Sequence, residues 1–197
     1  MFFSKSTGGF YDNAIHGNAL PADAVEITDE EHASLLAGQA SGKRIVANAT
    51  GRPTLQDPPP PTAAAVWENI KAERDRRTEQ SGFQVGGKWY HSDAKSKLQH
   101  LGNKDTARDQ IAAGGTMADP LRDPLSGQPI PWKTMDGSWQ PLTVQLAFDI
   151  VNAGKAAELA HHAAAERHRA AMEAAADPAA YDFSTGWPPA FVREVLP

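Results

Sequence analysis

The stretch Asp57-Pro58-Pro59-Pro60-Pro61-Thr62 divides this chain of 197 residues. Consecutive prolines fix φ and favour an extended polyproline II rod, here roughly 12 Å long at ~3.1 Å per residue. We interpret the four prolines, 58–61, as a linker; the alternative is a ligand for a proline-recognition domain. The sequence therefore predicts an N-terminal module at residues 1–57 and a C-terminal domain at residues 62–197.

The composition excludes several classes of protein. Because the chain has no cysteine, it has no disulfide framework, no thiolate zinc site and no cysteine nucleophile. The net charge of −5 argues against nucleic-acid binding. No apolar run approaches the roughly 18 residues of a membrane span, and the first residues contain no apolar signal core. We therefore expect neither a membrane span nor export by the standard route.

The N-terminal module has the pattern of a small α/β unit. Thr28 and Glu31 have capping-box spacing and predict the start of a helix that stops near Gly38. Residues 50–53 predict a turn. Short apolar and aromatic runs between turn signals predict strands at residues 2–3, 10–11, 25–27 and 44–47.

The C-terminal domain combines helices with two hairpins. Gly86-Gly87 and Asp136-Gly137 predict two-residue turns, so that Phe83 would face Tyr90 and Trp139 would face Thr134. The prolines between residues 119 and 131 predict an irregular loop. Helical patterns predict helices at residues 62–81, 93–101, 104–113 and 141–176. The fold class is therefore α+β, with one long alanine-rich helix in the C-terminal domain.

Several of these helices have little apolar surface of their own. Leu98, Leu101 and Ile111 are the residues expected to hold the two middle helices against the core. The long helix has no large apolar residue beyond Leu159 except Met172, so we expect its second half to pack on another subunit or another protein, or to remain solvated. The aromatic tail, residues 181–191, should lie extended over the domain.

Large aromatic side chains are the candidates for binding a partner, although they are also common in cores. These candidates, with one methionine, are Trp67, Trp89, Trp132, Trp139, Met172, Trp187 and Phe191.

No catalytic motif accompanies them. The chain lacks a nucleophile elbow, a P-loop, an H-E-x-x-H and a G-x-G-x-x-G sequence. Glu158, His162 and Glu166 fall at i, i+4 and i+8 on one face of the long helix, a spacing that can bind a metal but is commoner on solvated polar faces. We expect no catalytic residue, no metal and no cofactor; a metal-dependent enzyme built on these residues and His161 is the alternative.

Three regions carry a resemblance to a known family. The first runs from Val25-Glu26-Ile27-Thr28-Asp29-Glu30-Glu31 to Gly51-Arg52-Pro53, just before the prolines. The second is Gly82-Phe83-Gln84-Val85 with Trp89-Tyr90-His91-Ser92-Asp93, and the third is Gly186-Trp187-Pro188. In this order the chain resembles tail fibre assembly proteins of tailed phages and of phage-derived particles such as tailocins. The second and third regions are similar to a domain of uncharacterised function that recurs in phage tail proteins.

The resemblance implies an intermolecular chaperone. Such proteins help a fibre protein to fold and trimerise, and some stay on the fibre tip. The implied partner is the C-terminal region of a tail fibre protein, with a homo-oligomer as a further expectation and the host cytoplasm as the place of assembly. The alternative is a structural adhesin at the tip that recognises the host. The family has no catalytic residues that could be assigned to this chain.

Overall fold

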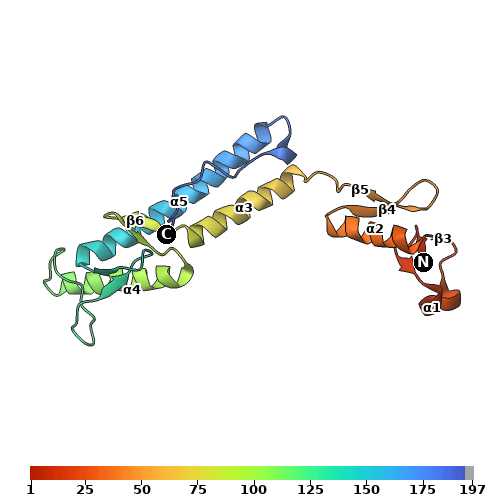
Figure 1. Ribbon diagram of the computed structural model, residues 1–197. Helices are drawn as coiled ribbons and strands as arrows, with labels where there is room; N and C mark the ends of the chain where they lie inside the picture. The colour runs from red at the N-terminus through yellow and green to blue at the C-terminus, as the bar shows by residue number, and fades with distance from the viewer. Residues whose placement is uncertain (194–197) are drawn as a thin grey trace. The chain divides into compact units, whose positions relative to one another are not determined.

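The computed structural model describes residues 1–193, apart from the side chain of Asn18. It divides into two compact units, one ending at Pro60 and one beginning at Pro61, which are coloured red to orange and yellow to blue in Figure 1. Each unit is described by itself. Within residues 1–193, no helix is both long enough and apolar enough to cross a membrane.

The N-terminal unit, residues 1–60, contains two small antiparallel sheets and one main helix. Strand β1 lies between β2 and β3 in the first sheet, and β4 pairs with β5 in the second. The elements are β1 (Phe2–Ser4), β2 (Phe10–Tyr11), α1 (Asn13–His16), η1 (Gly17–Ala19), β3 (Ala24–Glu26), α2 (Asp29–Ala40), β4 (Arg44–Ala47) and β5 (Pro53–Gln56). The predicted strands are therefore confirmed, whereas α1 and β5 lack a clear signal in the sequence.

Helix α2 covers the core of this unit. Its capping box is present: the Thr28 hydroxyl accepts from the Glu31 amide at 3.1 Å, and the Thr28 amide donates to the Glu31 carboxylate at 2.9 Å. The helix continues past Gly38, its predicted stop, and ends at Ala40. Gly38 serves close packing instead, because a Cβ there would overlap the side chain of Leu55 on β5. Phe3, Ile27 and Leu35 form the buried centre.

The C-terminal unit, from Pro61 onward, is built around the long helix α5. Figure 1 shows α4 beside the first half of α5 and α3 beside the second half, in agreement with the cores described below. The elements are α3 (Ala63–Gln80), β6 (Phe83–Val85), β7 (Lys88–Tyr90), α4 (Ala94–Ala112), β8 (Pro131–Lys133), β9 (Trp139–Pro141), α5 (Val144–Ala174) and η2 (Pro178–Ala180). The α+β class predicted from the sequence is confirmed.

The first core of this unit joins α4, the first half of α5 and the β6–β7 hairpin. Its buried residues include Ala107 from α4, Ala147 and Ile150 from α5, and the cross-strand pair Phe83–Tyr90. The predicted register of this hairpin is therefore confirmed. The two helices predicted at residues 93–101 and 104–113 are, in contrast, one continuous helix, α4. Gly102 keeps helical geometry, and the packing of α4 on α5 offsets the cost of about 1 kcal/mol that a glycine adds inside a helix.

The second hairpin differs from its predicted register by one residue. Trp139 pairs with Lys133 rather than with Thr134, so the connecting loop has five residues and not two. The reason is Asp136, whose carboxylate accepts hydrogen bonds from the Thr134 hydroxyl at 2.6 Å and from the Ser138 amide at 2.9 Å. These bonds close the loop from within and make a longer turn more favourable than the two-residue one.

The second core joins α3 to the second half of α5 and corrects the largest error of the sequence analysis. Val66 and Ile70 from α3 pack against Ala165 and Met172 from α5, and all four are buried. The tail crosses the same core with Tyr181, Phe183 and Trp187. The alanine-rich half of α5 is therefore docked on its own chain, because aromatic side chains from other segments supply the apolar area that it lacks.

Candidate functional site

The candidate partner-binding residues lie mostly inside the C-terminal unit. Trp67, Met172 and Trp187 belong to the second core, and Met172 is only 2% exposed. The Trp187 indole donates to the Phe183 carbonyl at 2.7 Å, and the Arg77 guanidinium lies 5.3 Å from the Trp187 ring centre. In the described fold these residues hold the tail onto α3 and α5.

Trp89 and Phe191 meet on the outer face of the first hairpin, with ring centres 6.2 Å apart. The Phe191 amide donates to the Ser81 carbonyl at 2.8 Å, which fixes the tail across this face. The sequence predicted a tail that lies extended over this domain, and this contact confirms it. Trp132 packs against the His100 ring in the first core, and Trp139, 66% exposed, is the most accessible of the seven candidates.

The residues considered for a metal do not converge. The Lys97 ammonium donates to the Glu158 carboxylate at 3.0 Å, and Glu166 lies 4.0 Å from Arg169. Within residues 1–193, no three His, Asp or Glu side chains are grouped as a metal site would need. Glu158 is therefore placed as one half of an ion pair between α4 and α5.

Two histidines lie buried along α5, seven residues apart: His161, which the sequence suggested only as part of a metal site, and His168, which had no predicted role. His168 hydrogen-bonds through Nδ1 to the Tyr181 hydroxyl at 2.9 Å, and its ring lies 4.8 Å from that of Trp187. His161 Nδ1 has no hydrogen-bond partner within the described residues. Burial lowers the pKa of both imidazoles, and the positive charge of Arg77 lowers each further. Both buried rings are therefore neutral at neutral pH, and His168 packs against the tail residues of the second core.

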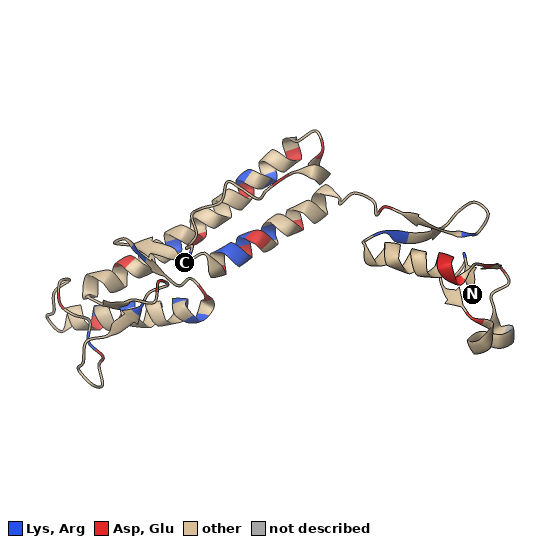
Figure 2. Ribbon diagram, viewed as in Figure 1, with Lys and Arg blue, Asp and Glu red and all other residues tan. Residues whose placement is uncertain are grey.

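Charge on α3 is organised as ion pairs on the helix itself. Glu73 accepts from Arg76 at 2.7 Å and from Arg77 at 2.6 Å, and hydrogen bonds from these arginines lower the Glu73 pKa to about 2. Figure 2 shows the resulting alternation of acidic and basic residues in the second half of α3. This part of the helix is thus internally compensated.

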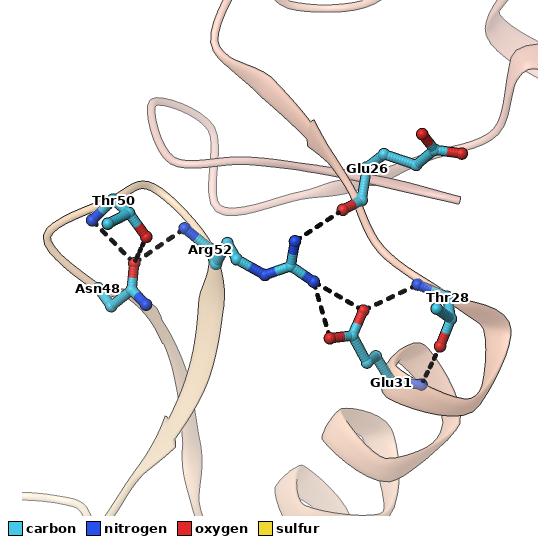
Figure 3. A network of polar contacts seen from close by, with 6 residues as sticks. All are labelled: Glu26, Thr28, Glu31, Asn48, Thr50 and Arg52. Atoms are coloured by element: carbon cyan, nitrogen blue, oxygen red, sulfur yellow. Dashed lines mark hydrogen bonds and ion pairs between the residues drawn. The ribbon is translucent and has the colours of Figure 1, made fainter.

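A polar network ties together the parts of the N-terminal unit (Figure 3). Arg52 Nη2 donates to both carboxylate oxygens of Glu31, at 2.7 and 2.9 Å, while Nη1 donates to the Glu26 carbonyl at 3.4 Å. Asn48 Oδ1 accepts from the amides of Thr50 and Arg52 and so shapes the turn that carries Arg52. The network joins the β4–β5 turn to the start of α2, which is a structural role.

An apolar groove of about 650 Å³ lies between α4 and α5 in the C-terminal unit. Its base contains Phe83, Ile150 and Gly154, and a Cβ at position 154 would lie 3.2 Å from the Phe83 ring. Its edges are Leu101 from α4, 54% exposed, and Leu159 from α5, 61% exposed. We call this feature the α4–α5 groove.

The groove corrects the role expected for two leucines. Leu98, Leu101 and Ile111 were expected to hold this stretch to the core; Ile111 does pack against it, together with Ala107, but Leu98 and Leu101 are exposed. The α4 side chains that are buried are those of His100 and Ala107, on other positions of the helix surface. Of the two, Leu101 lines the groove and Leu98 does not, so the leucine pair by itself could not have revealed the groove.

The family of the C-terminal unit follows from comparison with known proteins. The model of a domain of unknown function, DUF4376, matches residues 61–185, which begin where this unit begins. The chain belongs to this family. It is also 43% identical over 61 residues to a protein of Shigella phage SfV named "Probable tail fiber assembly protein".

That similarity covers 31% of this chain and 36% of the phage protein, so the chain spans about a third of the length of this relative. No solved structure matches the chain. The resemblance to tail fibre assembly proteins, with a domain of uncharacterised function, is thereby confirmed at the level of similarity.

Proposed function

We propose that this chain is an intermolecular chaperone that binds the C-terminal region of a phage tail fibre protein and assists its folding and trimerisation. The observation that carries the proposal is the 43% identity over 61 residues to a probable tail fibre assembly protein. The chain would act in the host cytoplasm while new fibre chains fold, in a phage or in a phage-derived particle.

The physical need for such a protein comes from the fibre. Tail fibres are β-rich trimers whose strands pair across long sequence separations, so their chains fold slowly and expose strand edges and apolar surface on the way. A protein that covers such surface before trimerisation reduces aggregation. The exposed apolar residues of the α4–α5 groove give this chain a surface suited to that task.

Co-expression tests the proposal. The fibre protein would be produced with the full chain, which carries an affinity tag, and the two proteins purified together. We expect a stable complex containing both proteins in a fixed ratio. A fibre that is soluble and trimeric but never retained by the tagged chain would contradict the proposal.

The protein content of purified particles shows whether the chaperone is released after assembly or remains bound to the fibre. We expect a released chaperone to be absent from purified particles by mass spectrometry. If it is present at fibre stoichiometry and antibodies against it block attachment to host cells, the chain is instead an adhesin of the fibre tip.

A further inference from the structure

The shape of the α4–α5 groove fits a rod-like occupant. The residues of α5 that line it run from Ile150 to His162, a span of about 18 Å at 1.5 Å per residue. A helix of about three turns has the same length. The volume of about 650 Å³ is enough for several apolar side chains, arranged in a row along the groove.

The walls of the groove favour a helix over a strand. Both walls are helices, α4 and α5, whose backbone amides and carbonyls are already bonded within each helix. An extended peptide placed between them would find no backbone partners and would bury its own amides and carbonyls unpaired, which is costly. A helix satisfies its backbone internally and presents only side chains to the walls.

Charge around the groove gives a second criterion. Glu158 is already paired with Lys97 at 3.0 Å, whereas Lys155 has no carboxylate within ion-pair distance among residues 1–193. The rim is therefore cationic on balance, and an occupant with acidic side chains beside its apolar face complements it.

The same criterion argues against a second copy of this chain. The described helix with an exposed i, i+3 leucine pair is α4, through Leu98 and Leu101. Beside these leucines Asp105 is paired with Arg108, so docking of α4 into the groove of another copy would bring Lys104 of one copy toward Lys155 of the other. Like charges placed opposite each other oppose such a contact.

We propose that the α4–α5 groove is the docking site for an amphipathic helix of about three turns that carries apolar residues at i, i+3 or i+4 and i+7, with acidic residues beside them. The assignment of this helix to the fibre protein rests on the proposed function; the chemistry of the occupant does not. The chemistry of the occupant follows from the length of the groove, its helical walls and the Lys155 ammonium, which has no ion-pair partner among residues 1–193.

Synthetic peptides test the groove independently of the fibre. One 14-residue peptide carries leucines at i, i+3, i+4 and i+7 with glutamates on its flanks; a second replaces the glutamates by lysines; a third has a central proline that prevents a helix. Binding of fluorescent peptides to the full chain is measured by anisotropy. We expect the acidic helix to bind at least tenfold more tightly than either of the others.

Variants of the chain test whether the peptide binds in the groove. Leu159→Glu should weaken the acidic peptide at least tenfold, whereas Leu125→Glu, at a position 96% exposed outside the groove, should leave it unchanged. Lys155→Glu should reverse the preference, so that the lysine peptide binds more tightly than the glutamate peptide. All three positions are exposed, and far-ultraviolet circular dichroism checks that each variant is folded.

Three results would overturn the inference. Equal or undetectable binding of the three peptides would show that the groove does not select an acidic helix. If Leu159→Glu leaves the binding of the acidic peptide unchanged, the peptide binds outside the groove. A dimer of the chain alone, converted to a monomer by Leu159→Glu, would show that a second copy covers the groove.

The fibre protein supplies the separate test of the proposed function. If the fibre fails to bind while the acidic peptide binds in the groove, the proposed function is wrong and the groove assignment stands. If the fibre binds and Leu159→Glu leaves that complex unchanged, the function stands and the groove is not the docking site.

Discussion

Replacement of Met172 by alanine should destabilise the C-terminal unit far more than replacement of Leu159 by alanine on the same helix. Met172 is 2% exposed and packs with Val66 and Ile70 of α3, whereas Leu159 is 61% exposed. Both positions lie inside α5, so both substitutions change helix propensity by a similar small amount. The difference between them therefore measures packing in the second core.

The expected magnitude follows from burial. Truncation of a buried methionine costs about 2–5 kcal/mol, through lost transfer free energy and the cavity left behind. Met172 lies two residues before the end of α5, where the chain can partly close the cavity, so we expect the lower part of this range, about 2–3 kcal/mol. That loss corresponds to a factor of about 30–150 in the unfolding equilibrium. Leu159→Ala should cost less than about 1 kcal/mol.

Urea unfolding of the full chain, followed by circular dichroism and tryptophan fluorescence, measures both values. Trp67 and Trp187 lie in the second core, so their emission reports its opening. Equal small losses for the two variants would show that the second half of α5 is not docked on this chain. A loss for Met172→Ala that depends on protein concentration would instead indicate a contact between subunits.

Three further predictions concern pH, modularity and capping. The pKa values of His161 and His168 lie below the unfolded value of 6.5, so the unfolded chain binds more protons than the folded one as the pH falls. The free energy of unfolding should therefore be highest above about pH 7 and decrease as the pH drops from 7 to 5. Urea titrations at a series of pH values measure this decrease, which His168→Gln should reduce. Proteolytic cleavage at a site introduced within residues 58–61 should leave two pieces that each unfold cooperatively in calorimetry, and loss of the transition in either piece would show a shared core. Thr28→Ala should cost about 1 kcal/mol in the N-terminal unit by removing the side-chain cap of α2, and an unchanged midpoint in urea would mean that the capping box contributes nothing.

Local signals in the sequence predicted most elements of the fold. The spacing of Thr28 and Glu31 gave the start of α2, and Gly86-Gly87 gave the register of the first hairpin. These features depend on residues within one turn of the chain, where the relevant hydrogen bonds are made between near neighbours. Asp136 shows the limit: its side chain closes a five-residue loop, which the Asp-Gly turn signal alone does not distinguish from a two-residue turn.

Long-range packing was less predictable. The alanine-rich half of α5 carries one large apolar residue, so its own composition suggests a helix without a partner in the chain. The apolar area comes from Trp67 on α3, which is far from this half of α5 in sequence, and from Tyr181 and Trp187 in the tail, which folds back over the helix. Small alanine side chains let these elements approach closely, and a pattern read along one helix cannot show what other segments bring to it.

The candidate site illustrates the same limit. Aromatic residues were chosen for their chemistry, but most of them fill cores of this chain, and Met172 is buried with them. The α4–α5 groove depends on Leu101 and Leu159, which lie about sixty residues apart and become neighbours of one groove only when α4 packs along α5. Single exposed leucines are common on protein surfaces, so neither residue alone predicts a binding site.

The yield of trimeric fibre with and without this chain tests the central claim most directly. The fibre protein is expressed alone, with the full chain, and with the Leu159→Glu variant, and the soluble fibre is sized by light scattering. The account predicts that the fibre alone is largely insoluble or not trimeric, and that the full chain restores soluble trimer. Equal yields of trimeric fibre with and without the chain would contradict it.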